Sequence, residues 1–223
     1  AVETTWRDRA VRYLVPPDRA ADAERAFGRT AAMMEHFSGI IGVPFPWPRY
    51  DQVVVHEFVF GGMENVACTT MTDLILVDAK AELEWEPDTL VAHELAHQWF
   101  GDLVTCQDWS QGWLNESWAT FMEAVWAEHT HGPTADHPDE PSSAAVWFRW
   151  NTAAGYHTEA AGRYRRPIVS YEFREPIDLF DRHLYNKGSC VLWTLRHDLG
   201  AAAFWAGVRA YLELHRHETV HTR

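Results

Sequence analysis

The 223-residue sequence is poor in cysteine, in basic residues and in long apolar runs. Its three cysteines, Cys68, Cys106 and Cys190, are odd in number and widely spaced, which argues against a disulfide framework and against a cysteine-based zinc site. We interpret them as small, mostly buried side chains that fit a reducing compartment. On this ground we predict a cytoplasmic location.

The shortage of basic residues limits the kinds of molecule that this protein is expected to bind. Lysine and arginine together number 19 against 32 aspartates and glutamates, for a net charge of −13. A surface that binds nucleic acid needs clustered lysines and arginines to meet the phosphates, so we predict no nucleic-acid partner. The negative balance favours a cationic group, such as a peptide amino terminus, over an anionic ligand, although a solvated acidic surface is the simpler explanation.

Long apolar segments are also missing. No apolar run reaches the ~20 residues of a membrane span, and no signal peptide or targeting segment is visible. The length fits one large domain, and 12 tryptophans are ample for a core. Because the chain begins at Ala1 and stops in a polar stretch, we expect a piece of a larger protein, with residues 1–16 as a linker or the end of a preceding β domain.

Proline and glycine divide the rest into a small β region and a longer helical region. A helix is predicted from Pro17 to about Ser38, ended by Gly39, and then an extended connector at residues 42–48, where three prolines remove backbone donors. Strands are predicted at residues 52–58, 66–71 and 74–77. Helices are predicted at residues 87–100, 113–130, 144–160, 185–199 and 201–215, with a surface loop at residues 132–143.

A basic stretch holds Arg163, Arg165 and Arg166. We interpret it as a solvated loop, with neutralisation of a carboxylate as the alternative.

The most informative feature is a pair of histidines with a glutamate between them, His93-Glu94-Leu95-Ala96-His97, followed by Glu116 after eighteen intervening residues. Helix positions i and i+4 lie on one face, so both imidazoles can converge on one ion. Three protein ligands (His93, His97 and Glu116) leave a fourth zinc position for water, which is typical of a catalytic site. Glu94 follows a ligand directly and is the candidate general base for that water.

A second copy of the same pattern, His217-Glu218-Thr219-Val220-His221, stands two residues from the end of the chain. It has no downstream acid to complete a ligand set, and its two β-branched residues weaken a helix. We interpret this copy as a coincidence.

Four motifs in order resemble the zinc aminopeptidases of the aminopeptidase N type, a family that includes a leukotriene-hydrolysing relative. They are Gly61-Gly62-Met63-Glu64-Asn65, the segment from His93 to Asp102, Trp113-Leu114-Asn115-Glu116 and Tyr185-Asn186-Lys187-Gly188. Two departures from the family pattern are Gly62, where alanine is usual, and Ser117, where glycine is usual. Neither position carries a side chain expected to do chemistry, although both changes alter local backbone freedom.

The resemblance implies an α+β, mostly helical fold: a thermolysin-like catalytic domain over residues 1–223, with a small N-terminal sheet and a helical half. It implies a following helical domain outside this chain. It also implies one zinc ion on His93, His97 and Glu116, with Glu94 as general base. Tyr185 resembles the tyrosine that stabilises the tetrahedral intermediate, and Glu64 resembles the acid that holds the free α-ammonium of a peptide substrate.

Residues Gly61 to Asn65 would accordingly bind substrate, since glycines let a peptide backbone approach closely. A structural glutamate in a turn is the alternative for Glu64, and a packing role is the alternative for Tyr185. Asp102 and Asn115 are candidates to orient the histidines. For the whole chain, the rivals to an aminopeptidase are an endopeptidase or leukotriene-type hydrolase on the same zinc frame, and a zinc module without catalysis.

Overall fold

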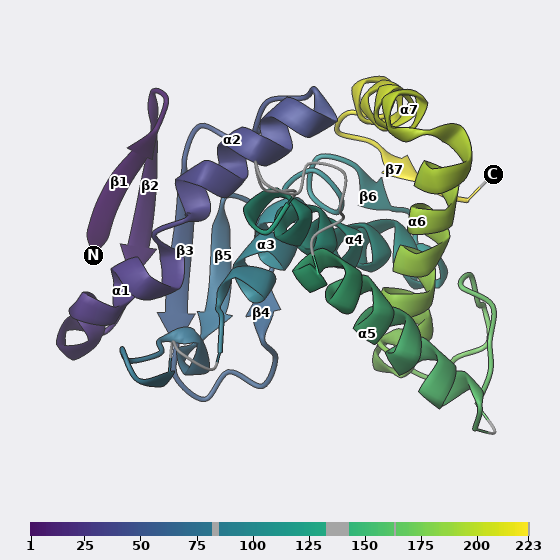
Figure 1. The fold of residues 1–223 in the computed structure, drawn as a ribbon, viewed down its shortest axis with the longest axis horizontal. Coiled ribbons are helices and arrows are strands. Elements are labelled where there is room, and N and C mark those ends of the chain that lie inside the picture. Colours follow the sequence, from purple (N-terminus) through teal and green to yellow (C-terminus); the bar gives the residue numbers. More distant parts are fainter. Residues whose placement is uncertain (82–84, 133–142, 163, 223) are drawn as a thin grey trace.

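A computed structural model describes residues 1–81, 85–132, 143–162 and 164–222. The sheet lies at one end of the molecule together with helices α1 (Ala20–Phe27) and α2 (Thr30–Ile41), and the later helices lie at the other end, with α3 (Asp88–Ala96) and α4 (Trp113–Thr130) between them (Figure 1). This arrangement confirms the predicted α+β class. Most of the predicted loop at residues 132–143, together with Arg163, lies outside the described residues.

The sheet has five strands in the order β1-β2-β3-β5-β4. Its inner pairs, β2 with β3 and β3 with β5, are parallel, and the outer pairs are antiparallel. Side chains alternate along β2, where Val11 and Tyr13 are buried, as expected for a strand with one face on a core. The strands are β1 (Val2–Trp6), β2 (Arg9–Leu14), β3 (Tyr50–Val55), β4 (Gly62–Met63) and β5 (Cys68–Thr72).

Two segments of this half differ from the sequence-based expectation or refine it. Residues 1–16, expected to be a linker or the end of a preceding domain, contain the β1–β2 hairpin, whose second strand pairs with β3. The strand predicted at residues 74–77 is wrong, because Asp73–Ile75 forms the short 3₁₀ helix η2. Thr72 caps it by accepting a hydrogen bond from the Leu74 N–H, which starts a helical turn directly after β5.

The helix predicted from Pro17 to Ser38 is three pieces: η1 (Pro17–Arg19), α1 (Ala20–Phe27) and α2 (Thr30–Ile41). Gly39 lies inside α2, and Gly42 ends it with a φ of 77°. That left-handed conformation costs glycine little, which explains why termination falls on the second glycine. Residues 42–49 form neither helix nor strand, as predicted for the connector, but bends interrupt the predicted extended course. Trp99 Nε1 donates to Val43 O within this segment at 2.9 Å.

The helical half follows the predicted order closely. Phe100 and Trp118 stack with ring centroids 4.5 Å apart, which packs the end of the α3 region against α4. No helix among the described residues is long and apolar enough to cross a membrane. The elements are α3 (Asp88–Ala96), β6 (Thr105–Cys106), η4 (Trp109–Gln111), α4 (Trp113–Thr130), α5 (Ser143–Ala160), η5 (Pro176–Leu179), the π-helical turn η6 (His183–Lys187), α6 (Gly188–Leu199), α7 (Ala201–Leu214) and β7 (Thr219–Val220).

Candidate active site

Helix α3 begins directly after Pro87 and carries the first histidine pair. Its first residue, Asp88, is buried and accepts hydrogen bonds from Arg29 Nε at 2.8 Å and from Trp126 Nε1 at 2.7 Å. These bonds fix the start of α3 against α4. His97 caps the other end of α3, and its N–H donates to His93 O at 3.3 Å. Both imidazoles therefore stand one turn apart on the same face.

The structure brings His93, His97 and Glu116 together at one point. His93 Nε2 lies 3.2 Å from His97 Nε2 and 3.2 Å from Glu116 Oε2, and His97 Nε2 lies 3.3 Å from the same Glu116 oxygen. Ligands held about 2.0–2.1 Å from a tetrahedral zinc ion stand about 3.3–3.4 Å from one another. The three atoms thus have the mutual spacing of a zinc ligand set.

The hydrogen bond that each imidazole makes through its Nδ1 atom determines whether its Nε2 atom carries a proton or a lone pair. His93 Nδ1 lies 2.6 Å from Glu123 Oε1, and His97 Nδ1 lies 3.0 Å from Phe100 O. In the neutral imidazoles each Nδ1 therefore donates its proton outward, and each Nε2 then turns a lone pair toward the other ring and toward the Glu116 carboxylate. Three lone-pair donors facing one another are stabilised by a cation placed between them, so these residues fit a zinc ion.

The electrostatics of the cluster also favour positive charge at this point. Burial disfavours a cationic His97, yet the charge and hydrogen bond of Glu116 raise its pKa to about 9. Burial likewise opposes ionisation of Glu116, but the two histidines lower its pKa to about 2. A site that stabilises an imidazolium so strongly is suited to bind a metal cation in its place.

Glu94 lies beside these candidate ligands, and one of its carboxylate oxygens is within 4.8 Å of a ring nitrogen of His97. Its Oε2 is buried and has no hydrogen-bond partner, and burial raises the pKa of this carboxyl to about 7. Gly62 packs directly against it, because a Cβ built on Gly62 would lie 2.2 Å from Glu94 Oε1. The glycine found where the family usually has alanine thus leaves room for this carboxylate.

Glu64 reaches the same place from the edge of the sheet. One of its carboxylate oxygens lies within 4.8 Å of ligand atoms of Glu94 and His97. Its backbone is held by Gln98, whose side chain donates to Glu64 O at 3.2 Å and accepts from the Ala67 N–H at 2.8 Å. Because Gln98 follows His97 directly in the chain, its hydrogen bonds tie the segment of Glu64 to the end of the helix that carries His97.

Tyr185 lies on the π-helical turn η6 and lines the same cavity. Its ring lies 6.0 Å from the ring of His93. Burial, followed by the charges of Glu116, Glu64 and Glu94, raises the pKa of the phenol far above its usual range. At neutral pH Tyr185 is therefore a neutral hydrogen-bond donor that points into a group of acids.

Sequence reasoning missed the partners of the histidines. Asp102 and Asn115 were the candidates, but Glu123 and the carbonyl of Phe100 occupy the two Nδ1 atoms. Asn115 Oδ1 instead accepts from the Cys106 N–H at 3.1 Å. The signal for Glu123 was available, because it lies seven residues after Glu116 and hence on the same face of α4.

The second histidine pair is not on a helix. His217 has a φ of 63°, and Thr219–Val220 forms β7, which pairs with β6. In a strand the two histidines of this pattern cannot share a helical face. Among the described residues, no group of three potential ligands includes His217 or His221, which agrees with the interpretation of this copy as a coincidence.

A cavity of about 1340 Å³ contains the whole constellation. Its wall includes the zinc-ligand candidates, Glu94, Tyr185 and all of residues Gly61 to Asn65. Aromatic side chains extend the wall away from the ligands, among them Trp85, Trp109, Trp126, Trp147 and Phe180. The chamber is large enough for several residues of an extended peptide.

Comparisons with known proteins agree with this geometry. Residues 25–223 match the family model described as the peptidase family M1 domain. The chain is 33% identical over 207 residues to human endoplasmic reticulum aminopeptidase 1, covering 91% of this chain and 21% of that protein. It is 34% identical over 204 residues to aminopeptidase N of Streptomyces lividans, covering 87% of this chain and 22% of that protein.

Solved structures give the same result. A mutant M1 zinc metallopeptidase from Deinococcus radiodurans, bound to a Tyr-Ser-Ala substrate, matches with a TM-score of 0.69 and 25% identity, covering 100% of this chain and 45% of that one. The chain spans about a fifth of the length of the curated relatives named above. Together these matches confirm the family resemblance that the four motifs indicated.

Proposed function

Because this chain belongs to peptidase family M1, we propose that the protein is a zinc-dependent aminopeptidase, which hydrolyses the first peptide bond of substrates with a free amino terminus. One observation carries the proposal: His93, His97 and Glu116 converge within 3.3 Å of one another in a cavity that also receives Glu64 and Tyr185. The relatives named as aminopeptidases and the relative bound to a tripeptide support it.

One zinc ion held by His93, His97 and Glu116 would supply an activated water and a Lewis acid for the scissile carbonyl. Glu123 and the Phe100 carbonyl hold the two imidazoles in the tautomer that such an ion requires. These outward hydrogen bonds also raise the basicity of the ligands.

Glu94 accepts the proton of the attacking water and delivers it to the departing amine. Its Oε2 is buried without a hydrogen-bond partner, and one of its carboxylate oxygens lies within 4.8 Å of a ring nitrogen of His97. Burial raises the pKa of this carboxyl toward neutrality, which suits a group that accepts and returns a proton. General acid–base catalysis of this kind contributes about a hundredfold to ten-thousandfold.

Tyr185 donates a hydrogen bond to the carbonyl oxygen as negative charge develops on it. The raised pKa keeps the phenol protonated, and its fixed position removes the cost of reorganisation during the reaction. The ring of Tyr185 lies 6.0 Å from the ring of His93. A carbonyl oxygen bound beside His93 would therefore lie within reach of the Tyr185 phenol.

Glu64 pairs with the α-ammonium of the substrate. Its carboxylate lies within 4.8 Å of Glu94 and His97, and one peptide unit spans about 3.5 Å. An ammonium held by Glu64 therefore leaves the first carbonyl of the chain next to Glu94 and the ligands. An interior peptide segment lacks that charge and would leave Glu64 unpaired.

The location in the cell is a separate proposal. Cys68, Cys106 and Cys190 are free thiols, which supports a reducing, cytoplasmic compartment.

Metal content and hydrolysis measured together test the proposed function. The purified protein should contain one zinc per chain and hydrolyse aminoacyl chromogenic amides, with activity lost to a chelator and restored by zinc. Glu116→Gln should lower zinc retention, because a charged ligand is lost. A His217→Asn/His221→Asn variant is the control and should keep its zinc; zinc that depends on that pair would contradict the proposal.

A further inference from the structure

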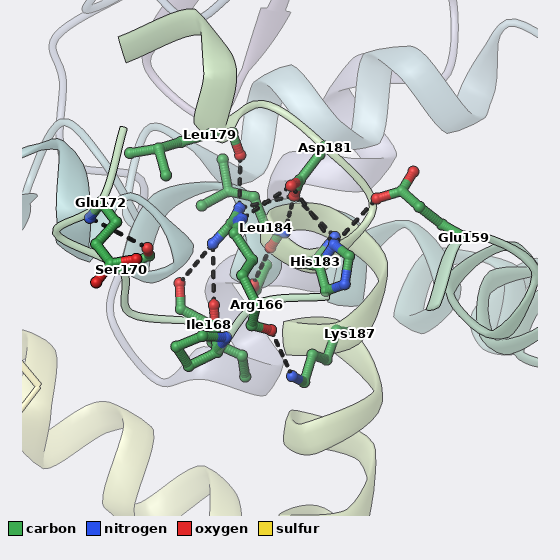
Figure 2. Close-up of polar contacts among 12 residues, drawn as sticks. Glu159, Arg166, Ile168, Ser170, Glu172, Leu179, Asp181, His183, Leu184 and Lys187 are labelled. Atoms are coloured by element: carbon green, nitrogen blue, oxygen red, sulfur yellow. Dashed lines mark hydrogen bonds and ion pairs between the residues drawn. The ribbon is translucent and has the colours of Figure 1, made fainter. Parts of the chain in front are cut away.

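Arg166 is buried beneath the segment that leads to Tyr185, and all five of its N–H donors are used. Its side chain is 6% exposed. Nε and one Nη2 hydrogen bind the two oxygens of Asp181 at 2.8 and 2.6 Å. The other donors bind Leu179 O at 2.7 Å and the carbonyls of Pro167 and Ile168 at 3.0 Å each. The interpretation of this arginine as part of a solvated loop is therefore wrong, and the alternative of a carboxylate partner is correct (Figure 2).

Asp181 in turn takes up the first free N–H groups of the turn η6. Its Oδ1 accepts from the N–H groups of His183 and Leu184, both at 2.9 Å. Its main-chain carbonyl accepts from Leu184 and Tyr185, both at 3.1 Å. The start of a helical segment leaves such donors unpaired, and here one residue serves three of them. The direction of the turn that carries Tyr185 therefore depends on how Asp181 is held.

The turn η6 has the i→i+5 hydrogen bonding of a π-helix and is held by contacts on two sides. Lys187 N donates to Arg182 O at 2.9 Å, a bond across five residues, and the Lys187 ammonium binds Arg166 O at 2.9 Å. π-helical turns are rare and occur often at functional sites. On the other side, the Ser117 hydroxyl of α4 donates to Leu184 O. The turn is thus clamped between Arg166 and the helix that carries Glu116.

A neighbouring histidine, His183, is buried against the same carboxylate and is also drawn in Figure 2. His183 Nδ1 lies 3.0 Å from Glu159 Oε1 and 3.4 Å from Asp181 Oδ2. These three groups resemble a cation site in composition. However, the Arg166 guanidinium already neutralises Asp181, and its hydrogen bonds hold the pKa of that carboxyl below its usual range although burial opposes this. The Arg166 guanidinium thus takes the place that a bound cation would have in this cluster. The cluster therefore holds the turn η6 in place.

We propose that Arg166 and Asp181 are positioning residues, which set the Tyr185 phenol against the reacting carbonyl. This inference rests on the proposed function, since Tyr185 matters only if it stabilises the transition state. The chain of contacts runs from the guanidinium to the Asp181 carboxylate, which accepts from the N–H groups of His183 and Leu184. The main-chain carbonyl of the same Asp181 accepts from the Tyr185 N–H, so holding Asp181 also holds the backbone of Tyr185.

A double-mutant cycle tests the proposal in the zinc-loaded protein. Arg166→Gln should lower kcat by about ten- to a hundredfold with KM changed less than about threefold, because the contact to Tyr185 forms in the transition state. In a Tyr185→Phe background the same change should cost less than about twofold, because residues in one pathway are not additive. Arg165→Gln, at an exposed neighbouring arginine, is the matched control and should leave kcat unchanged. Equal losses in both backgrounds would show a general structural role and overturn the proposal.

A second readout does not depend on activity. With 3-fluorotyrosine incorporated at position 185, the ¹⁹F resonance should shift in Arg166→Gln and stay in place in Arg165→Gln. Asp181→Asn provides the same comparison if Arg166→Gln does not fold. An unchanged resonance would overturn the positioning role even in a protein without aminopeptidase activity. An unaltered kcat in Tyr185→Phe alone, with the resonance shift present, would instead remove Tyr185 from the mechanism and leave Arg166 as its structural anchor.

Discussion

Glu123 Oε1 lies 2.6 Å from His93 Nδ1, so a carboxylate on α4 receives the outward proton of an imidazole on α3. This bond joins the two helices that supply the ligand set, and it fixes which nitrogen of His93 faces His97 and Glu116. Glu123 is largely shielded from solvent, and this desolvation raises its pKa although His93 opposes that shift. The hydrogen bond with His93 therefore favours the ionised form of Glu123, and the ionised Glu123 in turn fixes the orientation of the His93 ring.

Glu123→Gln should weaken zinc retention by about 10- to 100-fold while leaving the ligands in place, because an amide is a poorer acceptor for the His93 N–H. Competition with a chelator of known affinity measures this. Glu128→Gln is the matched control on the same helix, since Glu128 pairs with Arg149 and Arg196 rather than with a histidine. Equal retention in both variants would leave Glu123 without a role at the metal.

Glu94→Gln should keep zinc and lose about a hundredfold to ten-thousandfold in kcat, since the amide cannot accept the proton of the attacking water. Steady-state kinetics with metal analysis of the same sample measures both quantities. Glu86→Gln, at a second glutamate in the wall of the cavity, should retain most activity. A normal rate in Glu94→Gln would exclude it as the general base.

The stacked pair His36 and His129 should make stability depend on pH. Their rings lie 3.9 Å apart, and burial, followed by the charge of His129, lowers the pKa of His36 from its ordinary 6.5 to about 4. Between these values the unfolded chain binds a proton that the folded chain does not, so stability falls as pH drops from about 6.5 to about 4. After allowance for solvent screening we expect His36 to contribute about 1–2 kcal/mol to this loss.

Urea denaturation of the protein and of His36→Gln at pH 7.5 and pH 5 measures that contribution. The variant should lose less stability on acidification than the parent. Equal losses of stability in the two proteins would mean that folding does not lower the pKa of His36.

The convergence of the proposed zinc ligands was predictable because their spacing is local. His93 and His97 lie one turn apart, and Glu116 lies near the start of the next long helix, so periodicity placed the histidine pair on one helical face and Glu116 on a second helix. The four motifs added Glu64 and Tyr185 by resemblance, and the structure shows both in the wall of the same cavity.

What escaped prediction depends on contacts between distant segments. Asp181 and Arg166 are separated by a stretch without regular strands or long helices, and nothing local indicates that this arginine is buried. The β1–β2 hairpin was missed for a related reason, since its second strand pairs with β3 across residues 15–49. The end of α2 was misplaced because two glycines competed and only the backbone conformation of Gly42 decides between them.

Glu64→Ala should lower kcat/KM for substrates with a free amine by about 30- to 5,000-fold, which corresponds to the ~2–5 kcal/mol cost of truncating one partner of a buried charge pair. It should leave the slow hydrolysis of N-acetylated peptides nearly unchanged, so the gap between the two substrate classes narrows. Glu86→Gln again serves as the control in the same cavity. A variant that demands a free amine as strictly as its parent would make Glu64 a structural residue.

The most direct measurement is product analysis of one peptide offered with a free and with an acetylated amino terminus. By mass spectrometry over time, the free peptide should lose single residues in order from its N-terminus, and the acetylated peptide should be degraded far more slowly. Internal fragments from either peptide, or cleavage of the acetylated form at a comparable rate, would contradict an aminopeptidase and favour an endopeptidase on the same zinc frame.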